Sequence, residues 1–393
     1  MVNQKYIALV DCDSFFVSCE QKRNPELKGK PVCVLSNNDG CVISRSKEAK
    51  LAGVKMGEPY FMAKKDHPKC IYITAEHDYY SQVSKQVIKI LKDFSPYVQV
   101  YSIDEAFVDF TGLTKLYRRN YYNLAKLLRE KILKEADIPV SIGVSSTKTL
   151  SKLASDKAKK VPAGIYLIGK RKLKKELPQT QISEIWGIGR RLTVNLKRNG
   201  ILTAEELVNH SDKWLDSKIG IHGIEMRHEL LGEMVSPVSN DDKMPKSIQN
   251  TRAFGTFTSD IDFIKNELKK HIHTSCRKLR SYGTKCMQIG VMLRTKDFRV
   301  FYTKKDLLAP VNFELEISEI AFKLLEEIYR PEILYRSTGV YFGKIGEQNT
   351  EQLSLYSDTS SDTKKDNLAK CFDKLEAKFG KNIVQTGFFK YNK

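Results

Sequence analysis

The sequence lacks three features that would assign it to common classes of protein. No apolar run approaches the 18 or so residues that a transmembrane helix requires. The opening stretch MVNQKYIALVDCDSFF has a short apolar run interrupted by Asp, so we do not expect a signal peptide. The eight cysteines form no CxxC pair and no zinc-binding spacing. Free thiols and a cytoplasmic location are therefore expected.

Acidic residues are in the minority. The chain has 47 Asp and Glu against 66 Lys and Arg, which gives a net charge of +19. Such an excess favours a polyanionic partner, and nucleic acid is the commonest one in the cytoplasm. A basic membrane-surface protein is the alternative, but the sequence shows no basic amphipathic helix beside a lipidation motif, so no membrane partner is expected. A length of 393 residues with 41% hydrophobic residues predicts two to four globular domains, at roughly 100–200 residues each.

Apolar patterning predicts an α+β multidomain protein. In chain order it indicates a strand, an amphipathic helix, a hairpin, a second long helix and a strand, at 5–12, 78–94, 100–110, 116–137 and 138–146. A further helix is predicted at 147–160. This order is typical of a split-βαβ sheet, which we expect to carry its helices on one face.

The second half of the chain is organised differently. Residues 171–240 have little strand signal and predict a small all-helical unit, and the polar stretch 239–247 suggests a linker. Strand-like runs mixed with two helices predict a second α+β domain over 248–345. A polar tail begins at 346, with one more helix predicted over 364–380.

The predicted hairpin, VYSIDEAFVDF, has adjacent carboxylates at its turn, Asp104 and Glu105. Turn chemistry alone explains a single Asp at such a place. Asp11, however, ends a strand predicted to lie in the same sheet. If these strands are neighbours, the three acids converge, and their repulsion would require a cation. Oxygen ligands of this kind favour Mg²⁺, and two such ions could clamp a phosphoryl transfer.

A different motif gives a competing hypothesis. Ser145 to Lys148 fits the S-x-x-K pattern of penicillin-binding enzymes, but the companion S-D-N and K-T-G patterns are absent. Ser146 or Thr147 is better explained as the cap of the following helix.

Several motifs together resemble the Y-family, or translesion, DNA polymerases. They are LVDCDSFFVSCE, YSIDEAF and SIGVSSTKTLSKLASDKAKK, at 9–20, 101–107 and 141–160. The stretch SNNDGCVISRSKEAKLAGVKMGEPYF at 36–61 is similar to the UmuC-like branch. The resemblance spans about 5–345 and implies a right-hand polymerase. Its expected parts are a split-βαβ palm, small fingers, a helical thumb, an α+β little finger and a C-terminal tail, at 1–20 with 80–170, 21–79, 171–240, 246–345 and 346–393.

The resemblance also implies roles for active-site residues. Two Mg²⁺ ions would be held by Asp11, Asp104 and Glu105, with the backbone carbonyl of Cys12 as a further ligand. Phe15 and Phe16 would contact the nucleotide, although core packing is the simpler explanation of a lone Phe. Phe16 would be the steric gate that rejects the ribonucleotide 2′-hydroxyl.

Cations for the triphosphate follow from the same resemblance. Lys159 and Lys50 match phosphate-binding positions of the family. Where many relatives carry a Tyr, this chain has Lys47, whose role is left open.

DNA and clamp contacts are expected from three segments. IWGIGRRLTVNLKRNGI resembles a helix–hairpin–helix, in which two glycines bring backbone N–H groups to a phosphate and basic residues add charge, namely Gly187, Gly189, Arg190, Arg191 and Lys197. An ordinary helix–helix turn is the alternative. Residues 265–305 hold 12 Lys and Arg against 2 Asp and Glu, as a phosphate-tracking surface would. A short peptide resembles a docking motif for the bacterial sliding clamp through Gln352, Leu353, Leu355 and Tyr356.

The sequence therefore predicts an error-prone DNA polymerase that adds dNTPs to a primer–template and is associated with the nucleoid. UmuD-type accessory subunits or a recombinase filament are candidate partners. A nucleotidyl cyclase could share the sheet and its carboxylates, although it would not need the basic second half. The third hypothesis is a non-catalytic DNA-binding or clamp-binding protein. The presence of all three acids, Asp11, Asp104 and Glu105, argues against it.

Overall fold

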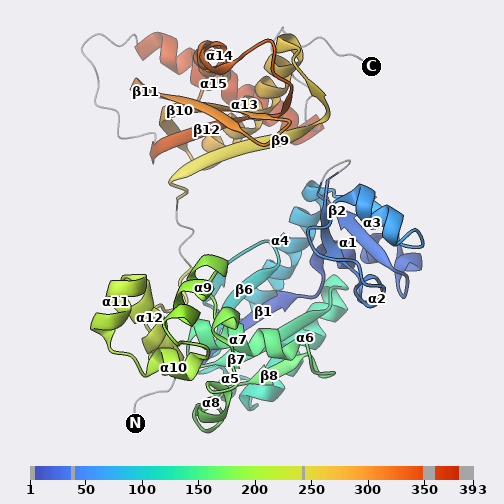
Figure 1. Ribbon diagram of the computed structural model, residues 1–393, viewed down its shortest axis with the longest axis vertical. Coiled ribbons are helices and arrows are strands. Elements are labelled where there is room, and N and C mark those ends of the chain that lie inside the picture. The colour runs from blue at the N-terminus through green and yellow to red at the C-terminus, as the bar shows by residue number, and fades with distance from the viewer. Residues whose placement is uncertain (1–4, 37–39, 241–243, 348–358, 380–393) are drawn as a thin grey trace. The chain divides into compact units, whose positions relative to one another are not determined.

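The computed structural model describes residues 5–36, 40–240, 244–347 and 359–379. The chain forms two compact units, residues 1–241 and 242–393, and each is described by itself (Figure 1). All eight cysteines are free, as the sequence predicts. Within the described residues, no helix combines the length and the apolarity needed to span a membrane.

A five-stranded sheet is the centre of the first unit, with the strand order β5-β6-β1-β7-β8. Its strands are β1 (Ile7–Cys12), β5 (Val98–Val100), β6 (Glu105–Asp109), β7 (Val140–Ser145) and β8 (Ile165–Leu167). Strand β1 pairs antiparallel with both β6 and β7, whereas β7 and β8 are parallel. The predicted hairpin is confirmed, since β5 and β6 pair antiparallel with Val100 opposite Ala106.

Two long helices cover one face of this sheet, α4 (His77–Phe94) and α6 (Tyr121–Ala136). Their apolar residues form one core with the side chains of alternate β1 positions, Ala8 and Val10. Helix α6 begins later than the predicted residue 116, because the Asn120 side chain accepts a hydrogen bond from Asn123 N at 2.8 Å and caps the helix there. A short helix, α5 (Leu113–Leu116), precedes it.

Helix α7 (Lys148–Ala158) packs on the opposite face, so the expectation that all helices lie on one face is wrong. The Ser151 hydroxyl donates to the carbonyl of Ile7 at 2.7 Å. The close approach is possible because β7 has Gly143 beneath the helix, where a Cβ would lie 2.0 Å from Ser155 N. Thr147 caps the helix through its hydroxyl, which accepts from Leu150 N, and it is one of the two caps that the sequence predicts.

A small three-stranded sheet, in the order β3-β2-β4, follows β1 in the chain. Its strands and neighbouring helices are α1 (Phe15–Arg23), the 3-10 helix η1 (Pro25–Leu27), β2 (Val32–Leu35), β3 (Val42–Arg45), α2 (Lys47–Leu51), α3 (Tyr60–Asp66) and β4 (Ile71–Thr74). The sheet has a small core of its own, which includes Leu35, Val42 and Ala63.

Within the described residues 170–231 the chain is helical and has no strand, as predicted. The elements are α8 (Lys170–Glu176), η2 (Ile182–Glu184), α9 (Arg190–Arg198), α10 (Ala204–Val208), α11 (Asp212–Ile219) and α12 (Ile221–Leu230). They share a separate apolar core. The buried Glu229 of α12 accepts from Thr149 N at 2.8 Å and thereby joins this helical part to the start of α7.

The second unit contains a four-stranded antiparallel sheet in the order β11-β10-β12-β9. Its elements are β9 (Ser247–Thr258), α13 (Ile261–Ser281), β10 (Thr284–Thr295), β11 (Val300–Val311), α14 (Glu314–Ile328), β12 (Tyr335–Glu347) and α15 (Thr359–Phe379). Helices α13 and α14 form the core with the sheet. Helix α15 lies against α13, where the Arg280 guanidinium contacts both Asp373 carboxylate oxygens at 2.7 Å.

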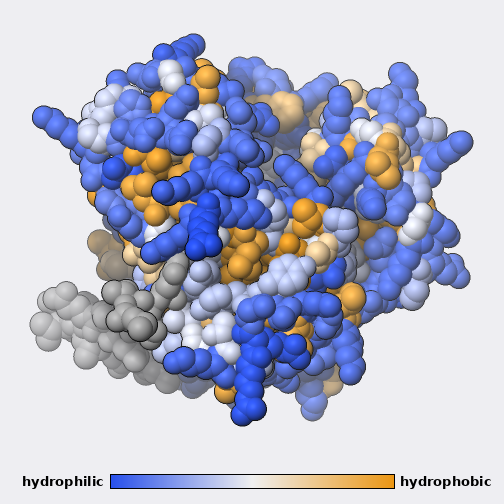
Figure 2. All heavy atoms as spheres, turned by 90° about the horizontal axis from the view of Figure 1, so that it is seen from below, coloured by the Kyte–Doolittle hydropathy of each residue, from blue (hydrophilic) through white to orange (hydrophobic). Residues whose placement is uncertain are grey.

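Polar side chains dominate the surface. In the face shown in Figure 2, hydrophilic residues surround small separated groups of apolar residues. Single exposed apolar side chains are normal for globular proteins.

Candidate active site

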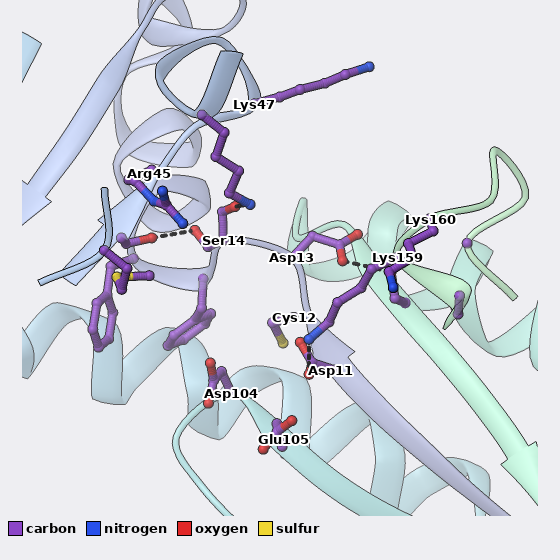
Figure 3. A pocket seen from close by; sticks show the side chains of 18 of the residues that line it. Asp11, Cys12, Asp13, Ser14, Arg45, Lys47, Asp104, Glu105, Lys159 and Lys160 are labelled. Atoms are coloured by element: carbon purple, nitrogen blue, oxygen red, sulfur yellow. Dashed lines mark hydrogen bonds and ion pairs between the residues drawn. The ribbon is translucent and has the colours of Figure 1, made fainter. Parts of the chain in front are cut away.

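A cavity of about 1010 Å³ lies at the end of β1 in the first unit. The strand end and the start of α1 form its floor, α2 and β3 line one side, and the end of α7 lines another (Figure 3). Segments that are distant in the sequence therefore meet at this cavity. Its lining includes every acid and lysine that the sequence analysis names for metal or nucleotide binding.

The pairing of β1 with β6 brings two of the predicted acids together. Asp11 and Glu105 are directly opposite each other in the strand register. Their carboxyl groups share a hydrogen bond. Asp11 is only 5% exposed, and burial together with this hydrogen bond raises its pKa to about 8, although Lys159 opposes the shift. Burial also acts to raise the pKa of Glu105, but its bonds to Asp11 and Lys152 overcome that effect and hold it below its usual value.

Asp104 lies on the hairpin turn beside this pair but has a different partner. Its carboxylate accepts from the Ser102 hydroxyl at 2.5 Å, and its backbone carbonyl accepts from Cys12 N at 2.9 Å. Among the described residues no three side chains of His, Cys, Asp or Glu are arranged as a set of metal ligands. The structure thus places Asp11 and Glu105 in contact on neighbouring strands, with Asp104 on the turn beside them.

Two lysines from the α7 segment contact the acids. Lys159 Nζ lies 2.6 Å from an Asp11 carboxylate oxygen, and Figure 3 shows its side chain reaching down to that residue. Lys152 forms a salt bridge with Glu105 and lies 3.7 Å from Asp11. The sequence reasoning missed Lys152. The sequence does contain a signal for this lysine, because Lys152 lies two helical turns before Lys159. That spacing places both lysines on one side of α7.

The donor set fits a hard divalent cation. Asp11, Asp104 and Glu105 supply carboxylate oxygens, which such ions prefer to nitrogen or sulfur. The contact between Asp11 and Glu105 is consistent with that chemistry, because two buried carboxyl groups this close need a shared proton or a nearby positive charge. Cys12 is buried, which raises the pKa of its thiol well above the usual value, so a thiolate ligand is not expected there.

The two neighbouring phenylalanines both line the cavity but differ in burial. Phe15 is 3% exposed and belongs to the core. Phe16 is partly buried and its ring stacks on Tyr80 with centroids 4.8 Å apart. Ser14, just before them, has a left-handed backbone with φ of 47°, which turns the chain from β1 into α1.

The basic residues of the small sheet differ in where they point. Lys50 Nζ donates to the Ser14 hydroxyl at 2.9 Å, and burial lowers the pKa of Lys50. Lys47 lines the cavity but extends away from the acids in Figure 3. Arg45, which sequence reasoning missed, also lines the cavity, and its guanidinium donates to the carbonyl of Val54.

The predicted helix–hairpin–helix lies in the helical part of the unit. Gly187 has φ of 92° and Gly189 is the N-terminal cap of α9, on which Arg190, Arg191 and Lys197 are exposed. These residues are not among those that line the cavity. The candidate clamp peptide, with Gln352, Leu353, Leu355 and Tyr356, falls outside the described residues.

Acids at the end of a split-βαβ sheet, beside a cavity and two lysines, fit the class of enzymes that transfer nucleotides. Comparison with known proteins identifies the class more closely. The impB/mucB/samB family matches residues 10–156, and the C-terminal domain of the same family matches residues 245–355. The chain belongs to this family.

The curated relatives agree along nearly the whole chain. UmuC of Salmonella typhimurium is 32% identical over 389 residues, which cover 96% of this chain and 92% of UmuC. DNA polymerase IV of Clostridium kluyveri is 30% identical, with 98% of both chains covered. Among solved structures, a chimera of the Y-family DNA polymerases Dbh and Dpo4 is 27% identical and superposes with a TM-score of 0.74. The match covers 87% of this chain and 99% of the chimera.

The protein is thus a Y-family DNA-directed DNA polymerase of the UmuC-like branch, the enzymes of translesion synthesis. The expected fold class and activity are confirmed. Its substrates are DNA and nucleotides, and its reaction depends on divalent metal ions.

Proposed function

We propose that the cavity at the end of β1 is the polymerase active site and that Asp11, Asp104 and Glu105 hold two Mg²⁺ ions there. The observation that carries the proposal is the register of β1 and β6, in which Asp11 lies opposite Glu105. At the end of the same strand, Cys12 N donates a hydrogen bond to the carbonyl of Asp104. The Cys12 carbonyl is a further proposed ligand. The ions would lower the pKa of the primer 3′-hydroxyl and stabilise the charge on the departing pyrophosphate.

The protein's own residues hold and orient the nucleotide. Lys159 and Lys50 provide positive charge for the triphosphate, and Lys47 could add to it by turning inward. Phe15 and Phe16 form the surface under the sugar, with Phe16 positioned to exclude a 2′-hydroxyl. Support comes from the cavity lining, which contains all five side chains.

The domain boundaries expected from the family remain a proposal. The palm would comprise 1–20 and 80–170, the fingers 21–79 and the thumb 171–240, followed by a little finger at 246–345 and a tail at 346–393. This division is supported by four separate apolar cores. Two belong to the two sheets of the first unit, one to its helical part and one to the second unit.

Further partners are proposed from the sequence. The thumb residues Gly187, Gly189, Arg190, Arg191 and Lys197 would bind a DNA backbone phosphate, which the exposure of the three basic residues supports. Residues 352–356 would bind the sliding clamp. We further propose a cytoplasmic, nucleoid-associated enzyme that acts with UmuD-type subunits or a recombinase filament.

Primer extension tests the active-site assignment. The full chain is given a primer–template, dNTPs and Mg²⁺, beside the variants Asp104→Ala and Asp93→Asn. Asp104→Ala should reduce extension by at least about 100-fold, since it removes a proposed ligand of the metal ions that stabilise transition-state charge. Asp93→Asn, which changes an exposed acid on α4, should extend like the parent.

Two results would contradict the proposal. Equal extension by Asp104→Ala and the parent would remove the hairpin acid from catalysis. Turnover of a nucleotide without primer or template would instead indicate cyclase-like chemistry, and DNA binding without any reaction would indicate a binding protein.

A further inference from the structure

Ser14 occupies a strained position at the junction of β1 and α1. Its backbone is left-handed, with φ of 47° and ψ of 46°. This conformation costs free energy for a residue with a Cβ, whereas glycine adopts it freely. The fold alone would therefore be served better by glycine. A side chain that is kept in a strained position beside an active-site cavity is a candidate for a functional role.

The usual structural role of a serine in this position is absent. Ser14 is the N-terminal cap of α1, and a cap serine normally accepts a hydrogen bond from a backbone N–H of the first turn. Ser46 does so at the start of α2, where its hydroxyl accepts from Ala49 N at 3.1 Å. The Ser14 hydroxyl forms no such bond. Helix capping therefore does not explain the Ser14 side chain.

The Ser14 hydroxyl instead holds the amine of Lys50. Lys50 Nζ, which comes from α2, donates to this hydroxyl at 2.9 Å. A second bond joins the same segments, since the Ser44 hydroxyl of β3 donates to the Ser14 carbonyl at 3.2 Å. All three residues line the cavity, and Figure 3 shows Ser14 on the side where Arg45 and Lys47 lie. Ser14 thus connects the end of β1 to the small sheet and determines where the Lys50 amine lies.

Lys50 benefits from an uncharged anchor. Its side chain is long, flexible and exposed, and among the described residues it has no salt-bridge partner. Arg45 and Lys159 repel the amine, whereas Asp13 and Asp11 attract it. A carboxylate anchor would neutralise the amine. A hydroxyl orients the amine and leaves its positive charge available to an arriving anion.

We propose that the Ser14 hydroxyl positions Lys50 for the triphosphate of the incoming nucleotide. The inference rests on the proposed phosphate-binding role of Lys50 and adds to it the residue that orients it. Ser14 acts through Lys50 and does not touch the reacting atoms. Because the amine is already placed before the nucleotide arrives, less conformational entropy is lost on binding. The contact should therefore affect nucleotide affinity and not the rate of the chemical step.

Single-turnover primer extension by the full chain tests the proposal, because it measures the dNTP Kd and the rate of chemistry separately. Ser14→Ala keeps the strained backbone and removes the hydroxyl, and Ser14→Gly removes both the strain and the hydroxyl. Each should raise the dNTP Kd by roughly 2- to 10-fold, the value of one hydrogen bond, with the rate of chemistry unchanged. Ser217→Ala, which removes an exposed hydroxyl on α11, should change neither quantity.

The variant Lys50→Met distinguishes failure of this inference from failure of the proposed role of Lys50. It should raise the dNTP Kd by more than either Ser14 variant, and Ser14→Ala should cause no further loss in that background, because the hydroxyl acts only through the amine. An unchanged Kd in Lys50→Met would refute the phosphate-binding role and the positioning role together. A raised Kd in Lys50→Met with an unchanged Kd in both Ser14 variants would refute the positioning role alone.

The pair of Ser14 variants separates positioning from a structural role. A raised Kd in Ser14→Ala but not in Ser14→Gly would assign the effect to backbone strain and overturn the proposal. Fully additive losses in the double variant, or a slower chemical step with unchanged Kd, would also overturn it. Thermal melting accompanies these measurements, and Ser14→Gly should melt at or above the temperature of the parent, because the left-handed position favours glycine. A clear loss of thermal stability in Ser14→Gly would assign the hydroxyl to folding.

Discussion

Two adjacent phenylalanines illustrate what single residues contribute at the active site. Successive residues of a helix point about 100° apart, so Phe15 and Phe16 at the start of α1 cannot face the same way. Phe15 is buried in the core, and Phe16 stacks on Tyr80 at the edge of the cavity. The buried Tyr80 also donates to Glu20, which fixes the surface on which Phe16 rests.

The position of Phe16 leads to a prediction about sugar selection. Phe16→Ala should raise the incorporation of ribonucleotides relative to deoxyribonucleotides by roughly 10- to 100-fold, because the ring that would collide with the 2′-hydroxyl is removed. The ratio is measured by single-nucleotide extension with each substrate in turn. Phe61→Ala, a change at an exposed Phe on α3, is the control. An unchanged ratio in Phe16→Ala would exclude the gate role.

At this scale the sequence predicted which acids become neighbours and missed the electrostatic contacts around them. The acids could be found because strand order determines which residues become neighbours, as Asp11 and Glu105 do. Lys152 could not be identified with equal ease, since a lysine on a basic helix usually faces solvent. The bond of Asp104 to Ser102 also could not be foreseen, because a rotamer choice depends on local partners and leaves no sequence pattern.

At the scale of elements, the contact between α7 and β7 positions the lysines of the site. The absence of a side chain at Gly143 lets the backbone of α7 lie against the strand. Apolar periodicity predicted both elements correctly but not the face that the helix covers. A small residue in a strand has several explanations, and only the packed structure shows which one applies.

Gly143→Ala should therefore damage both stability and activity. A Cβ at this position would lie 2.4 Å from the carbonyl oxygen of Ser151, and a helix backbone cannot move locally to avoid it. We expect a loss of about 3 kcal/mol or more in the free energy of unfolding, measured by urea denaturation, with reduced primer extension. Gly255→Ala is the matched control, because its Cβ would meet open space on β9. Equal stability of the two variants would refute the packing argument.

Within the second unit, helix α15 contacts α13 through ionic groups, one of which responds to pH. His273 of α13 lies between Glu314 at 2.7 Å and Glu376 at 3.1 Å. The hydrogen bond to Glu314 and the charges of both acids raise the pKa of His273, although burial opposes them. Because the folded-state pKa is raised, the stabilisation is complete below the unfolded value of about 6.5 and is lost as pH rises through the folded value.

The full chain and His273→Gln should consequently differ more in free energy of unfolding at pH 6 than at pH 9. Denaturation at several pH values and constant ionic strength measures the difference. In a Glu314→Gln background the pH dependence should shrink, since the main cause of the pKa shift is gone. A difference that is the same at both pH values would rule out this role for His273.

At the scale of the whole molecule, the net charge of +19 determines how the protein meets DNA. Affinity for a primer–template should fall by roughly 1000-fold or more between 50 and 200 mM salt, because bound counterions are released from the phosphates. Titrations at several salt concentrations give the slope. Arg191→Gln should reduce the slope by about one, and Lys92→Gln, at an exposed position on α4, should leave it unchanged. A slope near zero would contradict a phosphate-based grip.

The lysines above the acids have one more consequence. Since Lys159 and Lys152 already balance Asp11 and Glu105, the resting enzyme carries internal counterions. Under the proposed roles, a triphosphate would draw Lys159 away from Asp11, and the buried Asp11 carboxyl would then give up its proton only where another cation takes the place of that lysine. Nucleotide entry and cation capture would thus be coupled, so that the site acquires its full charge only when a substrate is there to use it.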